Sequence, residues 1–190
     1  MWYNNIGEVL FLGQNASEKG AVMFKQGDVV SYGATGVCRI SGECIQKVKG
    51  ENRRYLTLKP VYSPNSTVYV PIDNEVLLGK VKNLMTDEDA KALIQELPLS
   101  ETDWIENDAK RTESFTKIIE GGNRKELAEM VRALYVHRRE QLSKGKRLHA
   151  SDELFFRNAE KILFEELAEA LGIEPDQVLD FIENMDKKEA

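Results

Sequence analysis

The hydrophobic pattern of this chain changes its period once, near residue 83, and that change limits the folds available to it. Residues 24–82 carry short apolar runs that alternate with polar residues and are separated by turn-forming residues, as in β-strands. Beyond residue 83, apolar residues recur every three or four positions, as on one face of an α-helix. We therefore predict an α+β protein with a β domain over residues 23–82 and an all-α domain over residues 83–190.

In the β domain the pattern predicts five short strands joined by tight turns, which favours a small SH3- or Tudor-like β-barrel. The first strand is expected to end at Tyr32, and the second to span 37–48 with a kink at Ser41-Gly42. A hairpin turn at 49–52 follows, and the other three strands are expected over 55–58, 66–70 and 76–78. Pro71 removes a hydrogen-bond donor at the end of the fourth strand. Thr67–Val70 is therefore a candidate edge strand, and an ordinary paired strand is the alternative.

The all-α domain is predicted to contain about five helices. Thr86 begins the first with a capping box, and Pro98 ends it. Ser100 with Asp103 is expected to cap a second helix that carries Trp104 and ends at Gly121-Gly122. The third helix leads through a basic loop over 143–149 to a fourth, capped by Ser151 and closed by Gly172, and Pro175 opens the last. The side chains expected to face the core include Leu93, Ile94, Leu97, Phe115, Leu127, Met130, Val131, Leu134, Tyr135, Leu154, Phe155, Ile162, Leu163 and Leu167.

Residues 1–22 stand apart from this pattern and are predicted to be a leader or an upstream extension, with Met23 as the functional start. They have no basic start and no small-residue cleavage site, so a signal peptide is not expected. Disorder and pairing with an exposed strand edge are the two alternatives for this segment. No apolar stretch is long enough to span a bilayer, and we expect no membrane partner. Cys38 and Cys44 are predicted to be half-buried thiols of a cytoplasmic protein.

The net charge of −6 conceals an uneven distribution of charge. Residues 110–150 hold 11 basic against 5 acidic residues, whereas residues 151–190 hold 4 against 12. A basic stretch of this kind predicts a surface that binds an anion. A solvated helix face with pairs of opposite charge four residues apart is the alternative.

Motifs for catalysis and for metal binding are missing from the sequence. The two histidines, His137 and His149, have no cysteine or second histidine at the spacing of metal ligands. The glycines at 33 and 36 lie between strands, without the helix that a phosphate-binding loop needs. We therefore expect no catalytic residue, metal site, cofactor or small-molecule substrate, and we expect surfaces to carry the function.

An ordered series of motifs across both domains resembles the CarD/CdnL family of bacterial RNA polymerase-binding transcription regulators. In the β domain the series is Phe24-Lys25-x-Gly27-Asp28-x-Val30-x-Tyr32, Gly36, Lys49-Gly50, Tyr55-Leu56-x-Leu58, Val68-x-Val70-Pro71-x-x-Asn74 and Gly79. In the helical domain it is Trp104, Arg111, Glu126–Leu134, Arg138-Arg139 and Leu142-Ser143. The resemblance extends from about Met23 to Leu171, which is nearly the whole chain beyond the leader.

The resemblance implies a cytoplasmic, nucleoid-associated protein with two binding surfaces. The Tudor-like domain would dock on the RNA polymerase β subunit, at its β1 lobe, through the residues Thr67, Val68, Tyr69 and Val70. The helical domain would contact promoter DNA at the upstream edge of the melting bubble, where Trp104 would act as a minor-groove wedge that stabilises the promoter open complex. The DNA-binding residues around it, which would contact phosphates without reading sequence, are Lys110, Arg111, Arg138, Arg139, Lys144, Lys146 and Arg147.

The sequence departs from the family pattern at several places. Tyr69 stands where relatives often carry an arginine that faces polymerase, so an ion-pair version of this contact is not available. Gly33 replaces a proline, and the segment from Trp104 to Gly121 is longer than in some members. Trp104 as a helical core residue is the alternative to the wedge. Two other functions remain open: a protein-interaction module without DNA contact, and a stand-alone relative of the polymerase-binding domain of a transcription-repair coupling translocase.

Overall fold

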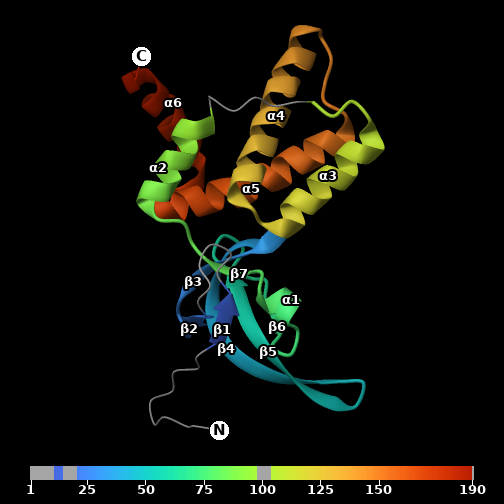
Figure 1. Cartoon of the computed structure of the whole chain (residues 1–190), viewed down its shortest axis with the longest axis vertical. Helices are drawn as coiled ribbons and strands as arrows, with labels where there is room; N and C mark the ends of the chain where they lie inside the picture. Colours follow the sequence, from blue (N-terminus) through green and yellow to red (C-terminus); the bar gives the residue numbers. More distant parts are fainter. Residues whose placement is uncertain (1–10, 15–20, 98–103, 190) are drawn as a thin grey trace. The chain divides into compact units, whose positions relative to one another are not determined.

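The computed structural model describes residues 11–14, 21–97 and 104–189, which divide into two compact units, residues 1–84 and 85–190 (Figure 1). Among the described residues, the first unit contains a five-stranded antiparallel sheet and the second contains five α-helices, so the expected α+β class with two parts is confirmed. None of the described helices is both long enough and apolar enough to cross a membrane.

The sheet has the strand order β6-β5-β4-β3-β7. Its strands are β3 (Val29–Tyr32), β4 (Gly36–Val48), β5 (Glu51–Pro60), β6 (Val68–Pro71) and β7 (Val81–Asn83). β4 and β5 form a long hairpin around Lys49 and Gly50, whose φ angles of 51° and 89° suit a tight two-residue turn. The register of this pair shifts between Ile40 and Gly42, which confirms the predicted kink.

One hydrophobic core lies within the sheet unit. It consists of Phe24, Val30, Cys38, Ile40, Leu56, Leu58, Val70 and Val81. Cys38 is fully buried, more deeply than expected, and Cys44 is half-buried. β1 (Phe11–Gln14) and β2 (Ala21–Phe24) pair as a separate two-stranded sheet, so the described residues of the predicted leader, 11–14 and 21–22, are extended, and β2 runs across its predicted end at residue 22.

The prediction of a strand over residues 76–78 is wrong. These residues belong to a single helical turn, α1 (Glu75–Leu78), because the side chain of Asn74 accepts a hydrogen bond from the backbone N–H of Leu77 and caps the turn. The fifth strand of the sheet is instead β7, which pairs with β3.

The second unit consists of α2 (Asp87–Glu96), α3 (Asp108–Gly121), α4 (Arg124–Ser143), α5 (Ala150–Leu171), a 3-10 turn (Pro175–Gln177) and α6 (Val178–Glu189). The capping box of Thr86 is confirmed, with Asp89 as its partner. The glycines at 122 and 172 close α3 and α5 with φ angles of 60° and 67°, as predicted. Pro98, Ser100 and Asp103, expected at the first helix end and the next cap, lie outside the described residues.

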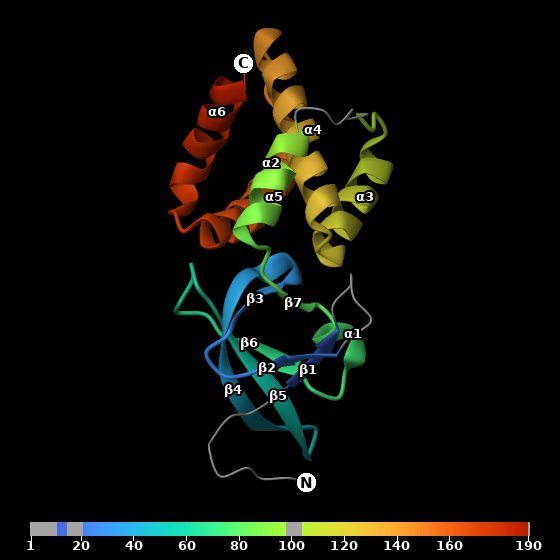
Figure 2. The same cartoon turned by 60° about the vertical axis from the view of Figure 1, so that its left-hand side comes forward.

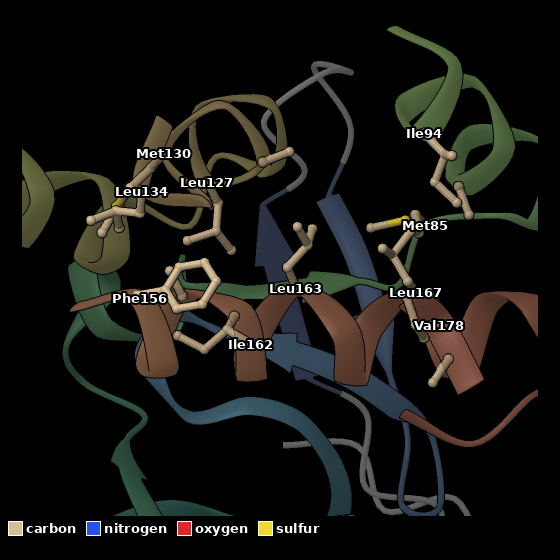
Figure 3. Packing of buried hydrophobic residues seen from close by; sticks show 14 of the residues in the cluster. Met85, Ile94, Leu127, Met130, Leu134, Phe156, Ile162, Leu163, Leu167 and Val178 are labelled. Atoms are coloured by element: carbon tan, nitrogen blue, oxygen red, sulfur yellow. The ribbon is translucent and has the colours of Figure 1, made fainter. Parts of the chain in front are cut away.

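The long helix α5 is central to the second unit. It contacts α2 and α6 toward one end, and α3 and α4 toward the other (Figures 1 and 2). Figure 3 shows the buried side chains that line this helix and meet those of α4 and α2. The labelled residues are Met85, Ile94, Leu127, Met130, Leu134, Phe156, Ile162, Leu163, Leu167 and Val178.

Three details of the predicted helices are corrected. Tyr135 and Leu154 are 45% and 61% exposed and do not face the core, whereas Phe156, two residues after Leu154 and on the opposite side of the helix, is buried. Residue 149 precedes the first turn of α5, so Ser151 lies inside the helix and its hydroxyl pairs with the ring of His149. The second predicted helix begins four residues after Trp104, at Asp108.

Candidate functional site

The strand β6 lies at one edge of the sheet, as predicted. It pairs with β5 through Leu56↔Val70, Thr57↔Tyr69 and Leu58↔Val68, and no other described strand pairs with it. Because side chains alternate along a strand, Val70 is buried in the core while Tyr69 points outward and is 47% exposed. The result is an open hydrogen-bonding edge with an exposed aromatic side chain on it.

A second aromatic side chain extends this exposed surface. The ring of Tyr55, on β5, meets the ring of Tyr69 edge to face, with centroids 6.4 Å apart and planes at 84°. This arrangement is favourable for two aromatic rings and restricts the rotamers of both. The outer face beside β6 therefore offers two neighbouring aromatic rings with their phenolic hydroxyls.

In the second unit Trp104 lies in irregular backbone before α3, half-buried among side chains from two helices. Its indole stacks on the imidazole of His137, on α4, with centroids 3.6 Å apart and planes only 9° from parallel. The guanidinium carbon of Arg111, on α3, is 4.7 Å from the centroid of the indole. Phe115 packs against the indole edge to face at 6.4 Å.

The backbone carrying Trp104 turns into α3 at Asn107. The side chain of Asn107 accepts a hydrogen bond from the N–H of Lys110, which satisfies a donor of the first helical turn. The predicted helical position of Trp104 is therefore wrong, and tertiary contacts hold its side chain. The sequence signal that could have placed the start of α3 correctly is this asparagine.

Arg111 is buried, with 4% of its surface exposed, and does not offer its charge to solvent. Its Nε and Nη2 atoms each donate to a different carboxylate oxygen of Asp152, both at 2.9 Å, and Asp152 is itself 4% exposed. Nη1 also donates to the carbonyl of Ile105 at 2.7 Å, and Nη2 to the carboxylate of Asp108 at 2.7 Å. These hydrogen bonds, above all that with Asp152, raise the pKa of Arg111.

Arg111 was expected to contact a phosphate, but its side chain is buried and does not support that role. Its guanidinium is satisfied inside the domain, where it connects the backbone before α3 to α5, and it is not presented at the surface. Asp152, its buried partner, was not predicted from the sequence. The separation of 41 residues between them leaves no local pattern from which the pair could be recognised.

The other predicted DNA-contacting cations are exposed. Two of them lie over aromatic rings: the guanidinium of Arg138 is 5.5 Å from the ring of Phe156, and that of Arg139 is 6.0 Å from the ring of Tyr135. The exposed cations are Lys110, Arg138, Arg139, Lys144, Lys146 and Arg147. Within the described part of the chain, no group of three or more histidine, cysteine or acidic side chains is placed to hold a metal ion.

Comparison with known families identifies both units. Residues 24–82 match the family model described as CarD-like/TRCF RID domain, which makes the sheet unit an RNA polymerase-interacting domain that binds the β subunit. Residues 91–183 match the model described as CarD, C-terminal domain. The chain belongs to the CarD family. It is an RNA polymerase-binding transcription regulator and not an enzyme, as the sequence predicted.

Proposed function

We propose that the protein docks on the β1 lobe of the polymerase β subunit through the edge of β6, and that its helical unit stabilises the open promoter complex. The observation that carries the docking mode is the open edge of β6 with Tyr69 exposed upon it. An exposed edge can accept a strand from a partner, with main-chain hydrogen bonds for affinity and side chains for specificity. The docking residues proposed are Thr67, Val68, Tyr69 and Val70.

The chemistry of this edge makes the contact aromatic. Tyr69 and Tyr55 present rings and hydroxyls, so the contact at this point gains from apolar burial. An aromatic side chain at the centre of an interface commonly contributes at least about 2 kcal/mol to binding, which is more than a tenfold change in affinity.

Tyr69→Ala tests the docking mode in the full-length protein. We expect its affinity for purified bacterial RNA polymerase, measured by biolayer interferometry, to fall by roughly tenfold or more. Tyr135→Ala is the matched control, because Tyr135 is a tyrosine of similar exposure (45%) in the other unit, and it should bind as the wild type does. Wild-type affinity for Tyr69→Ala would refute docking through this edge.

The second part of the proposal concerns promoter DNA. Trp104 would insert at a base step of the minor groove, which costs a few kcal/mol of unstacking and is offset by a better-held duplex. The six exposed cations would contact phosphates, so affinity for DNA should fall steeply with salt and should not depend on sequence. Such a regulator would act in the cytoplasm, where polymerase and promoter meet.

Trp104→Ala is the corresponding test. It should leave polymerase binding intact and shorten the lifetime of open complexes on a promoter, measured by competitor challenge. An unchanged lifetime would remove Trp104 from the proposal. Lys146→Ala should lower the salt dependence of DNA binding by about one counterion.

The packing of Trp104 supports a second candidate function, a protein-interaction module without DNA contact. Stacking on His137 and contact with Phe115 are what a tryptophan with a purely structural role would show. DNA binding measured at two salt concentrations separates the candidates, because phosphate contacts must weaken as salt rises. Binding that is absent at low salt supports the second candidate.

A further inference from the structure

We propose that His137 is a positioning residue for Trp104: it holds the indole in the orientation in which the proposed wedge meets DNA. The inference rests on the function proposed above for Trp104, and it assigns part of that function to a residue that would not itself touch DNA. What carries it is the stacked contact of the two rings, 3.6 Å apart and within 9° of parallel.

The tryptophan needs such a support because of its backbone. Residues 104–107 have no regular secondary structure, so no helix register fixes the direction of the side chain. A large side chain without restraint samples several rotamers, and ordering it on binding costs free energy. An indole that is already held in its binding orientation avoids that cost. A rigid support for the ring therefore increases the affinity for DNA.

His137 is itself held firmly enough to serve as the support. It lies on α4 three residues after Leu134, which is fully buried in the core. The side-chain amide of Gln141 lies within hydrogen-bond distance of His137, with its nitrogen 3.3 Å from the Nε2 atom of the imidazole. This side-chain contact and the attachment of His137 to the α4 backbone together fix the plane of the imidazole against which the indole lies.

A second restraint comes from α3. The guanidinium of Arg111 contacts the indole and is held in turn by Asp152 and by the carbonyl of Ile105, in the same segment as the tryptophan. The backbone of the segment is thus tied down by Arg111, while the stack with His137 restricts rotation of the ring. The imidazole also covers a face of the indole, so a base cannot stack on that face, and DNA would meet the part of the ring that His137 and Arg111 leave uncovered.

A purely structural role for His137 predicts different effects of substitution from a stacking role. If His137 only filled space, leucine would replace it well, since leucine is apolar and of comparable size. If its planar ring orients the indole, phenylalanine should replace it and leucine should not. His137→Phe and His137→Leu therefore form a matched pair in which planarity is the variable.

The experiment uses the full-length chain with Trp2→Phe, which leaves Trp104 as the single tryptophan. Three quantities are measured: acrylamide quenching of Trp104 fluorescence, affinity for RNA polymerase, and the lifetime of open complexes. For His137→Leu we expect stronger quenching, wild-type polymerase affinity and a lifetime shorter by roughly two- to tenfold. His137→Phe should keep all three near wild type, and His137→Ala replaces the leucine variant if that protein does not fold.

The outcomes separate this inference from the function on which it rests. Quenching or lifetime that is the same in His137→Leu as in the wild type, while Trp104→Ala shortens the lifetime, overturns the role of His137 and leaves the wedge standing. A lifetime that Trp104→Ala does not change overturns both. Equal defects in the leucine and phenylalanine variants also overturn the inference, because a stacking role requires rescue by the planar ring.

Discussion

Removal of the buried carboxylate of Asp152 should destabilise the helical unit strongly. Asp152→Ala takes away two charged hydrogen bonds of 2.9 Å and leaves the guanidinium of Arg111, 4% exposed, without its principal counter-charge. The guanidinium keeps the carbonyl of Ile105 and the carboxylate of Asp108 as partners, so its positive charge still has two hydrogen-bond acceptors.

These contacts set the size of the effect. Breaking one side of a buried ion pair typically costs about 3 to 5 kcal/mol, and the remaining partners of Arg111 place the expected loss near the lower limit, at about 3 kcal/mol. Asp108→Ala is the control on the same guanidinium. The side chain of Asp108 is 75% exposed, and a pair of that kind contributes at most about 1 kcal/mol.

The assay is urea unfolding of the full-length chain with Trp2→Phe, followed by the fluorescence of Trp104, which reports on the helical unit alone. A loss of about 3 kcal/mol corresponds to a midpoint lower by roughly 1 to 3 M urea. Asp152→Ala should also increase acrylamide quenching of Trp104, since Arg111 is held less firmly beside the indole once its principal partner is removed. The reasoning is refuted if Asp152→Ala costs less than Asp108→Ala.

Three further predictions concern stability. Leu167→Ala, at a fully buried position of α5, should cost about 2 to 5 kcal/mol in the same urea assay. Gly122→Ala should cost about 1 kcal/mol, because the φ angle of 60° at the end of α3 disfavours a side chain. Burial, opposed by Arg138 and reinforced by Glu153, raises the pKa of Glu160 above its ordinary value of 4.5, so its contribution to stability is present below that value and is lost as pH rises. Glu160→Gln should therefore melt above the wild type at pH 7 and together with it at pH 4, and a lower melting temperature at pH 7 would contradict the shift.

Local chemistry accounts for the features that the sequence predicted correctly. The capping box at Thr86 and the two terminal glycines act within one helical turn, so they can be recognised without knowledge of the fold. The kink before Gly42 and the edge position of β6 were also predictable, because a glycine inside a strand often marks a bulge and a proline in a sheet is confined to its edges. The run at 76–78 was too short for its period to be decisive, and Asn74 made it a helical turn.

Tertiary contacts determine the features of the candidate site that the sequence did not reveal. A positive side chain within a basic stretch suggests an exposed cation, yet Arg111 is buried because Asp152, from a distant helix, neutralises it. Nothing in the hydrophobic period distinguishes Arg111 from its neighbour Lys110, which is exposed. Likewise, the stack between Trp104 and His137 depends on how α4 packs beside the segment before α3, and that packing is set by the whole core.

The position of Trp104 outside a helix has a consequence for how this regulator can be tuned. A tryptophan within a helix would take its direction from the helix register, and only changes to the helix could redirect it. Here the direction depends on His137 and, through Arg111, on Asp152, neither of which lies in the segment that carries the tryptophan. We therefore expect substitutions at these two positions to alter how rigidly the proposed wedge is held without changing the wedge itself or the edge of β6, and so to change open-complex lifetime at constant polymerase affinity.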